Sequence, residues 1–550
     1  MKNRLVVILF ALSLFFVIPR AFRLQVLEWH NHRIYVESLR TRLINVPAPR
    51  GTIFSSDMVP LAWDREVYVL DPWGNDVEVM ERSGVLSKEE IKKLLSGERV
   101  VLDKNRAELL EKLGVRVTVD YERNYAGLAP HVLGYVNIDR EGMGGVERFY
   151  NDHLKGKEGV KMVFIEPTGK VTAEVLKAPP QAGRDLVLTI DSRLQRKAEE
   201  ILKTEKKAGV IILSNIKTGE ILAMASYPDF NPQDFSRGFS RRDWNRINND
   251  PQSVLLNRAI SSIYPPGSSI KVFWALVALL SGYNPKEIRY CSGAFHLKNS
   301  RGEVVATYKD WDIAGHGSVD LREALRVSCN VYFYQLGLSL GISRMSDMAR
   351  AFKIFDRTGI DLPGERAGYL GDPSWKVERM REPWFPGDTV QVSIGQGYIG
   401  VTPIGMLRLI SLVANKGVFF KPRVVKMIGR TEIAPKVETK VEIDDEIWNF
   451  LIKAMEDVTS FPGSSDSGPG TAYSAFRGFK YRVAGKTGTA ETGRGEPHSW
   501  FVGFAPVNDP EVGIVVIFEH GGFGSGVAAH TARKMLEEYF RLKESASGTP

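Results

Sequence analysis

The sequence is poor in cysteine, with only Cys291 and Cys329 among its 550 residues. Two cysteines exclude a disulfide-stapled scaffold and leave open one disulfide, one shared metal site or two free thiols. Excess charge of one sign is also scarce, since the formal net charge is +8 and no block of Lys or Arg is long enough for a nucleic-acid-binding tail. We therefore expect no nucleic acid partner.

Nothing in the composition is extreme either, with 43% hydrophobic and 25% charged residues, 51 Gly and 28 Pro. These values exclude collagen, a coiled coil and a mostly disordered chain. At roughly 100 to 200 residues per domain, the length predicts about three domains. The class is an ordinary folded protein with a large core.

One long apolar run stands at the N-terminus. In Leu5 to Ile18 only Ser13 is polar, and Lys2 and Arg4 precede the run. A signal peptide has the same pattern, but no small-x-small cleavage site follows, so we expect residues 1–24 to remain as a membrane anchor. The prediction is a single-pass protein of the cytoplasmic (inner) membrane with its body outside the cytoplasm.

The rest of the chain divides at a stiff segment, Pro179 to Gly183. Residues 25–183 contain short alternating runs and read as a β-rich, elongated domain. Residues 184–541 mix apolar helical segments with strands, which predicts an α+β domain with an antiparallel sheet flanked by helices. We expect residues 542–550 to form a flexible tail.

The most informative motif is Ser268-Ser269-Ile270-Lys271, which follows a Pro-Gly turn and precedes the apolar segment Val272 to Leu280. Positions three apart share one face of a helix, so Ser268 and Lys271 are expected to be neighbours. Burial and the positive helix end would depress the pKa of the lysine and make it a base for a serine nucleophile. The alternative is a capping serine beside a snorkelling lysine.

A second copy of the pattern, Ser214 to Lys217, serves as an internal control. Apolar strand-like runs stand on both sides of it, so we interpret it as a hairpin with no catalytic role.

Two further motifs follow, Ser328-Cys329-Asn330 between helical segments and Lys486-Thr487-Gly488-Thr489 after a strand-like stretch. If Ser328 and Asn330 point into a cleft, Cys329 points behind it. The glycine would let a ligand backbone approach the strand edge. The spacing from the nearest upstream glycine, Gly478, does not fit a phosphate-binding loop, so we expect no nucleotide.

Ser-x-x-Lys, Ser-x-Asn and Lys-Thr-Gly in this order are the signatures of penicillin-recognising serine acyltransferases. The chain resembles a class B penicillin-binding protein, a peptidoglycan D,D-transpeptidase, and is most similar to the elongation-type members called penicillin-binding protein 2. The resemblance implies a non-catalytic pedestal, or dimerisation-like, domain before a transpeptidase domain. Further matching segments are Arg50-Gly51-Thr52-Ile53, Gly142 to Tyr150, Thr218 to Met224, Gly395-Gln396-Gly397 and Trp500 to Pro506.

The resemblance implies a role for each catalytic residue. Ser268 would attack the penultimate D-alanyl carbonyl of a stem peptide, and Lys271 would take its proton. Ser328 and Lys486 would relay a proton to the departing D-alanine, and Asn330 would orient the donor amide. No cofactor is expected for this chemistry.

The remaining residues of the third motif are implied to bind the substrate. Backbone N–H groups of Ser268 and Thr489 would form the oxyanion hole, and the hydroxyls of Thr487 and Thr489 would hold the terminal carboxylate. Gly488 would keep this edge open.

The implied partners are peptidoglycan stem peptides, β-lactams and a membrane polymerase of the elongation machinery. An amine from a second stem peptide would resolve the acyl-enzyme into a crosslink, and a D,D-carboxypeptidase side activity stays open. The alternatives are a β-lactamase, a β-lactam-binding sensor, and chiefly a structural activator of a glycan polymerase. The residues before Leu5 leave little room for a sensor's cytoplasmic effector, and the domain before Pro179 argues against a β-lactamase. An elongation role and a division role are both compatible with the sequence.

Between the two cysteines lie Asp310 and His316. Thiolate, carboxylate and imidazole ligands suit tetrahedral zinc, and four protein ligands would make a closed, structural site. The resemblance implies such an ion behind the Ser-x-Asn motif, held by Asp310, His316 and Cys329, with Cys291 where relatives have a further aspartate. A disulfide between Cys291 and Cys329 remains the alternative.

Overall fold

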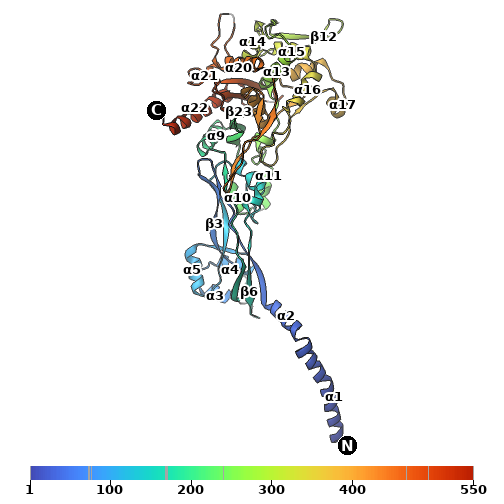
Figure 1. Cartoon of the computed structure of the whole chain (residues 1–550), viewed down its shortest axis with the longest axis vertical. Coiled ribbons are helices and arrows are strands. Elements are labelled where there is room, and N and C mark those ends of the chain that lie inside the picture. Colours follow the sequence, from blue (N-terminus) through green and yellow to red (C-terminus); the bar gives the residue numbers. More distant parts are fainter. Residues whose placement is uncertain are drawn as a thin grey trace. The chain divides into compact units, whose positions relative to one another are not determined.

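The computed structural model begins with a long apolar helix, α1 (Lys2–Phe22), followed by the short π-helix η1 (Arg23–Leu27) (Figure 1). Within them, Val6–Leu27 is long and apolar enough to cross a membrane. The structure describes residues 2–71, 75, 77–166, 171–238, 241–465, 467–493 and 495–548.

We predict that this helix stays attached in the mature protein, because no cleavage signal follows the apolar run. Mass spectrometry of the N-terminus of protein isolated from membranes should find it upstream of Leu5. A mature chain that starts between residues 21 and 25 would instead identify a cleaved signal peptide.

The chain forms two compact units that interleave in sequence. Unit 2 contains Asp185–Pro550 and takes two earlier segments, Thr52–Trp63 and Asn124–Asn151, out of the region before the expected boundary at 183. The contiguous division into 25–183 and 184–541 is therefore only partly realised. The physical reason is strand pairing, because β2 (Ile53–Phe54) pairs in parallel with β8 (Leu186–Leu188).

Unit 1 contains a three-stranded antiparallel sheet in the order β1-β6-β7. Its helices pack in part on a small apolar core around Leu110, which makes this unit less purely β than we expected. The elements with most of their residues in unit 1 are α2 (Trp29–Arg40), β1 (Thr41–Val46), β3 (Pro60–Leu70), α3 (Val77–Arg82), α4 (Lys88–Leu95), β4 (Val100–Leu102), α5 (Lys104–Lys112), β5 (Thr118–Tyr125), α8 (Asn151–Leu154), β6 (Gly159–Ile165) and β7 (Val171–Ala178).

Unit 2 is built on a five-stranded antiparallel sheet in the order β10-β9-β23-β22-β21. Strand β23 lies at the centre and is buried along its whole length, as its run of β-branched residues predicts. Strand β21 is an edge strand. The strands are β9 (Gly209–Asn215), β10 (Glu220–Tyr227), β21 (Ala484–Ala490), β22 (His498–Ala505) and β23 (Val512–Phe518).

Helices cover both faces of this sheet. Helices α9 (Ser192–Glu205) and α22 (Val527–Ser547) pack on one face, where alternate residues of β23 such as Ile514 and Val516 join one apolar cluster. Helix α19 (Pro403–Ala414) packs against β22, β23 and β9 on the other face. This arrangement confirms the expected sheet flanked by helices.

Helix α13 (Lys271–Leu280) is almost entirely buried, as its apolar composition on every side predicts. It packs against α14 (Leu321–Arg326), α15 (Asn330–Leu340), α16 (Ile342–Ala351) and α20 (Asp445–Ser460). Because α13 is packed on all sides, it can hold the Ser268–Lys271 motif at its N-terminal end in a fixed position.

The other elements of unit 2 are short. They are α6 (Pro130–Leu133), α7 (Gly145–Phe149), α10 (Pro232–Ser236), α11 (Arg241–Asn248), α12 (Arg258–Ser261), η2 (Gly267–Ile270), β11 (Arg289–Cys291), β12 (Ala294–Lys298), β13 (Val304–Lys309), β14 (Gly317–Val319), β15 (Tyr369–Leu370), α17 (Pro373–Met380), α18 (Pro386–Ser393), β16 (Ile399–Gly400), β17 (Val418–Phe420), β18 (Val425–Ile428), β19 (Thr431–Glu432), β20 (Val437–Lys440) and α21 (Tyr473–Phe476).

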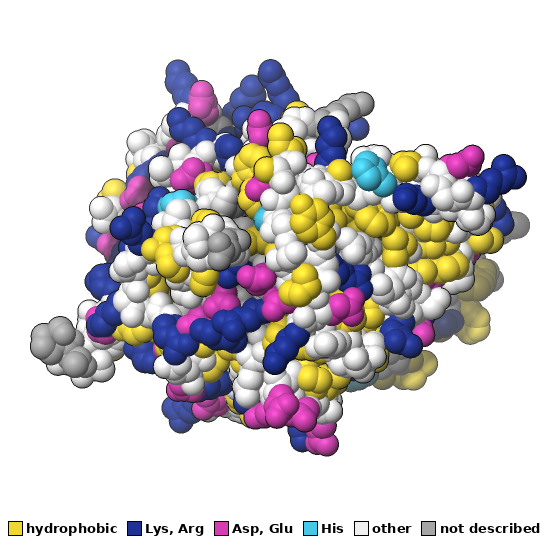
Figure 2. Space-filling view, turned by 90° about the horizontal axis from the view of Figure 1, so that it is seen from above, with side chains coloured by type: hydrophobic (Ala, Val, Ile, Leu, Met, Phe, Trp, Pro, Cys, Tyr) yellow, Lys and Arg dark blue, Asp and Glu magenta, His cyan; other side chains and the backbone are white. Residues whose placement is uncertain are grey.

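The C-terminal segment differs from the expected tail at 542–550. Helix α22 continues to Ser547, because Phe540 and the partly buried Leu542 still pack on the core of the unit. Residues 549 and 550 lie outside the described residues. On the surface that Figure 2 shows, basic and acidic side chains are interspersed with apolar ones, in line with the small net charge of +8.

Candidate active site

Ser268 lies in the 3-10 turn η2, and α13 begins at Lys271. We had expected Ser268 at the start of the helix, but it lies one turn before the α-helix begins. Its side chain is partly exposed, whereas Lys271 is fully buried. An accessible hydroxyl beside a buried amine is the arrangement that an activated nucleophile needs.

The turn is fixed from behind by a second glycine segment. The N–H of Gly267 donates to the carbonyl of Gly395 at 3.1 Å. A Cβ on Gly395 would lie 2.2 Å from the carbonyl oxygen of Gly267, so only glycine allows this approach. On the other side, the indole of Trp500 donates to the carbonyl of Pro265 at 3.1 Å.

Lys271 connects the nucleophile turn with the Ser-x-Asn motif. Its Nζ donates to the carbonyl oxygen of Ser328 at 2.9 Å and to Oδ1 of Asn330 at 2.7 Å. Burial disfavours the charged amine and lowers the pKa of Lys271 to about 8. At neutral pH a fraction of this lysine is therefore an uncharged base.

Ser328 and Asn330 stand where α14 ends and α15 begins, as expected. Ser328 has a left-handed backbone with φ +58°, and its Oγ accepts a hydrogen bond from Lys486 Nζ at 2.8 Å. Cys329 is the N-cap of α15, and its buried sulfur accepts the N–H of Tyr332. Cys329 does face away from the catalytic side chains, but the cause is this backbone turn and not the strand alternation that we assumed.

Lys486 lies within β21, which contains the whole Lys-Thr-Gly motif. The sequence placed the strand just before the motif, so this boundary was wrong. The side chain of Lys486 is fully buried. Burial and the nearby charge of Lys271 hold the pKa of Lys486 well below its usual value.

The three residues after Lys486 have different surroundings. The Thr487 hydroxyl lies 2.7 Å from that of Thr471, and the Thr489 hydroxyl accepts the N–H of Gly524 at 3.1 Å. Because Thr489 Oγ1 accepts in this bond, its own proton is free to be donated elsewhere. A Cβ on Gly488 would lie 2.9 Å from the carbonyl oxygen of Pro266, so the glycine keeps β21 close to the nucleophile turn.

The second Ser-x-x-Lys copy, Ser214 to Lys217, lies in a hairpin, as the sequence predicts. Strands β9 and β10 form an antiparallel hairpin around it, and Lys217 is half-exposed and pairs with Asp509. Ser214 is buried, and its hydroxyl donates to the carbonyl of Glu220 within the hairpin. Neither side chain has the surroundings of Ser268 or Lys271.

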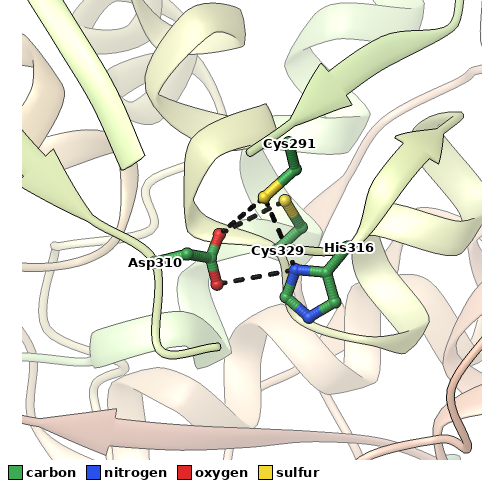
Figure 3. Close-up of side chains that lie close together, drawn as sticks. All are labelled: Cys291, Asp310, His316 and Cys329. Carbon is green, nitrogen blue, oxygen red and sulfur yellow. Dashed lines mark hydrogen bonds and ion pairs between the residues drawn. The ribbon is translucent and has the colours of Figure 1, made fainter. Parts of the chain in front are cut away.

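The four residues predicted as metal ligands converge on one point (Figure 3). Their ligand atoms all lie within 4.8 Å of one another. Cys291 Sγ and Cys329 Sγ lie 3.5 and 3.4 Å from Asp310 Oδ2. His316 Nδ1 lies 3.6 Å from Asp310 Oδ1 and 3.7 Å from Cys291 Sγ.

This cluster fits tetrahedral zinc in both chemistry and size. Ligands bound at about 2.0 to 2.3 Å around a tetrahedron are separated by roughly 3.3 to 3.8 Å. The four distances above, measured to both carboxylate oxygens of Asp310, fall in this range, and all the ligand atoms lie within 4.8 Å of one another. Both cysteines are free thiols in the structure. A hydrogen bond between them lowers the pKa of Cys291 to about 6 and raises that of Cys329, so one thiolate forms readily.

The sequence did not indicate the role of two residues that support the site. Gly395 was noted only as part of a matching motif, and Thr471 follows a Ser-Gly-Pro-rich segment that carries no chemical signal. Both act through contacts between segments far apart in the sequence, with Gly267 and with Thr487. Spacing in one sequence does not reveal such contacts.

Two known protein families match the chain. The penicillin binding protein transpeptidase domain matches residues 209–537, and the penicillin-binding protein dimerisation domain matches residues 45–188. The first match contains all twelve predicted catalytic, substrate-binding and metal-binding residues.

Proteins of known function are similar over most of the chain. Peptidoglycan D,D-transpeptidase MrdA of Acinetobacter baumannii is 31% identical, over 95% of this chain and 84% of its own. The complex of penicillin-binding protein PBP2 with MreC from Helicobacter pylori includes a chain that is 27% identical, with a TM-score of 0.76 over 91% of this chain and 99% of its own. A chain from a peptidoglycan synthase complex that coordinates polymerization and crosslinking is 30% identical, with a TM-score of 0.75 over 98% of both chains.

Proposed function

Because this chain belongs to the penicillin-binding protein transpeptidase family, we propose that the cluster around Ser268 carries out its reaction. The protein is a serine-type peptidoglycan D,D-transpeptidase, which crosslinks stem peptides through an acyl-enzyme and is inhibited by β-lactams. One observation supports the residue assignment most strongly. Two buried lysines of lowered pKa both hydrogen-bond to Ser328, and one of them, Lys271, begins the helix that follows the turn of the accessible Ser268.

In the proposed acylation, Ser268 Oγ attacks the carbonyl carbon of the penultimate D-alanine, and neutral Lys271 accepts the hydroxyl proton. The peptide bond to the terminal D-alanine then breaks. Its nitrogen receives a proton through the pair formed by Ser328 and Lys486, whose Oγ and Nζ are 2.8 Å apart. An amine of a second stem peptide attacks the acyl-enzyme, forms the crosslink and restores Ser268.

Substrate binding falls to the edge strand β21. The backbone N–H groups of Ser268 and Thr489 would stabilise the oxyanion, a contribution of about 3 to 4 kcal/mol per donor in serine hydrolases. The hydroxyls of Thr487 and Thr489 would donate to the terminal carboxylate. Thr489 suits this task because its oxygen already accepts the N–H of Gly524.

We expect acylation by penicillin to accelerate as the pH rises through about 8. Lys271 can accept the serine proton only when it is uncharged, and burial lowers its pKa to about 8. Raising the pH deprotonates this amine, so the second-order acylation rate should climb and then level off. Stopped-flow acylation between about pH 6 and about pH 10 measures the profile, and a rate that stays flat across this interval would argue against Lys271 as the base.

The finer role that we propose is in cell elongation, together with a membrane glycan polymerase. Support comes from the similarity to a chain of a peptidoglycan synthase complex that coordinates polymerization and crosslinking, and to PBP2 in its complex with MreC. The N-terminal helix would hold the protein in the inner membrane, with the catalytic unit outside the cytoplasm. A β-lactamase or a sensor is less compatible, since the similarity to transpeptidases includes the dimerisation domain.

The test is crosslinking by the purified full-length protein in lipid vesicles. Lipid-linked peptidoglycan precursor is supplied with and without a candidate elongation polymerase, and crosslinked muropeptides are counted after digestion. Crosslinks that require both the polymerase and Ser268 support the proposal. Polymer that stays uncrosslinked, or crosslinks that form equally with Ser268→Ala, would contradict it.

We further propose that Cys291, Asp310, His316 and Cys329 hold one structural zinc ion. The ion would supply no step of the reaction, because four protein ligands leave no open position. The ion would link the segment that runs from Cys291 through His316 with Cys329. Cys329 lies between the catalytic residues Ser328 and Asn330. The convergence of two thiols, a carboxylate and an imidazole in a buried cluster supports this proposal.

Protein purified without chelator is expected to contain about one zinc per chain, and His316→Ala should lose most of it. The matched control is His296→Ala, since His296 is exposed on β12 and contacts Thr307 outside the cluster. Elemental analysis gives the metal content, and thiol counting under denaturing conditions with chelator should find two thiols. Absence of both metal and titratable thiols would establish a disulfide instead.

A further inference from the structure

A half-exposed tryptophan lies against the Ser-x-Asn loop. Trp311 stands in the segment between β13 and β14, and 53% of its surface is exposed. Its indole Nε1 nevertheless donates to the carbonyl of Val327, the residue before Ser328, at 3.0 Å. The buried half of the ring contributes packing, and the indole N–H adds a directed hydrogen bond to the loop.

The adjacent residue holds the other side of the same loop. Asp310 Oδ2 accepts the backbone N–H of Val331 at 2.9 Å, just after Asn330. The loop is therefore hydrogen-bonded at both ends, at Val331 by Asp310 and at Val327 by Trp311. Ser328, Cys329 and Asn330 lie between these two attachment points.

The loop needs such support because of its backbone conformation. Ser328 has φ +58°, a region that residues other than glycine disfavour. In this conformation its Oγ meets Lys486 and its carbonyl oxygen meets Lys271. Relaxation of Ser328 to a negative φ would turn one or both groups away from the lysines.

We propose that Trp311 is a positioning residue for the transpeptidase reaction. Its N–H group fixes the Val327 carbonyl and thereby keeps Ser328 in the conformation that places Oγ against Lys486. The inference rests on the roles proposed above for Ser328 and Lys486. Trp311 itself touches no reacting atom.

The test compares Trp311→Phe with wild type by the rate of acylation with fluorescent penicillin, expressed per active site. Phenylalanine keeps an aromatic ring but removes the indole N–H together with the second ring, and the loss of the hydrogen bond should slow acylation about three- to tenfold, the usual net value of one hydrogen bond. The noncovalent binding constant should stay at the wild-type value, and the thermal unfolding midpoint should fall only slightly, because one hydrogen bond is lost. Trp244→Phe, on α11 and also partly exposed, is the matched control and should change nothing.

Further measurements separate the possible causes. The ring centroids of Trp311 and His316 lie 5.3 Å apart, so loss of zinc is a second cause that must be tested. Zinc is therefore added to Trp311→Phe. Restoration of the acylation rate would overturn the positioning role and show instead that Trp311 helps to retain the metal. Ser328→Ala is run in parallel. If it is slow while Trp311→Phe is normal, only the Trp311 inference fails. If Ser328→Ala is normal, the role of Ser328 fails, and this inference fails with it.

An isosteric substitution keeps the test decisive if Trp311→Phe does not fold. Benzothienylalanine at position 311, introduced by codon suppression, replaces the indole N–H with sulfur and preserves the ring. The same loss in rate would support the proposal. A wild-type rate in this variant would overturn it.

Discussion

Replacing Ser268 with alanine is expected to abolish covalent labelling by fluorescent penicillin. The variant keeps the turn η2, because the backbone bond between Gly267 and Gly395 that holds it does not involve the serine hydroxyl. It loses the accessible hydroxyl that forms the acyl bond, whereas the other hydroxyl of this turn, that of Ser269, is buried and donates to the carbonyl of Pro266. The expected loss is essentially complete, measured by in-gel fluorescence on the purified protein.

Ser214→Ala is the matched control, since it alters the second Ser-x-x-Lys copy. That hydroxyl bonds to the carbonyl of Glu220 inside a hairpin, so labelling should stay at the wild-type level with a small loss of stability. Labelling that survives in Ser268→Ala, or disappears in a folded Ser214→Ala protein, would overturn the assignment of the nucleophile.

Lys271→Met is expected to reduce the acylation rate by about 100-fold to about 10,000-fold, the range typical of a lost general base. Methionine fills the buried space of the lysine stem but cannot accept a proton. The bonds to the Ser328 carbonyl and to Asn330 are lost as well. Stopped-flow acylation at about pH 9, where most of the wild-type lysine is neutral, gives the largest contrast.

Lys217→Met provides the comparison within the same chain. Lys217 is half-exposed and paired with Asp509, so its loss should leave acylation unchanged. Circular dichroism and thermal unfolding establish that both variants fold. A folded Lys271→Met protein that acylates within about threefold of wild type would show that another group takes the serine proton.

The local structure around the predicted catalytic residues was predictable, because the local sequence signals agree with the three-dimensional surroundings. An apolar segment after Ser268 indicated a buried helix, and α13 is buried. Strand-like runs around Ser214 indicated a hairpin, and β9 and β10 form one. In each case the distinction depended on hydrophobic patterning over about ten neighbouring residues.

Other features could not be predicted, because they depend on contacts between distant segments. Gly395 fits against Gly267 although 128 positions separate them in the sequence. The left-handed backbone of Ser328 appears at a residue type that gives no warning of it. The interleaving of the two units arises from the pairing of β2 with β8 across the expected boundary.

The cluster of predicted metal ligands lies between these two cases. Residue types suggested zinc ligands, but the spacing from Cys291 to Cys329 lacks any Cys-x-x-Cys pair and could not predict convergence. The fold brings them together because β11 and β14 pair with Cys291 opposite Gly317, next to His316. Asp310 then reaches the same point from the end of β13.

Peptide mapping by mass spectrometry identifies directly the residue that penicillin acylates. The full-length protein is incubated with penicillin, quenched in acid, digested and searched for the acyl adduct. We predict one penicilloyl adduct per chain, on the peptide that contains Ser268. An adduct on Ser214, Ser328 or any other residue, or no adduct on folded protein, would contradict it.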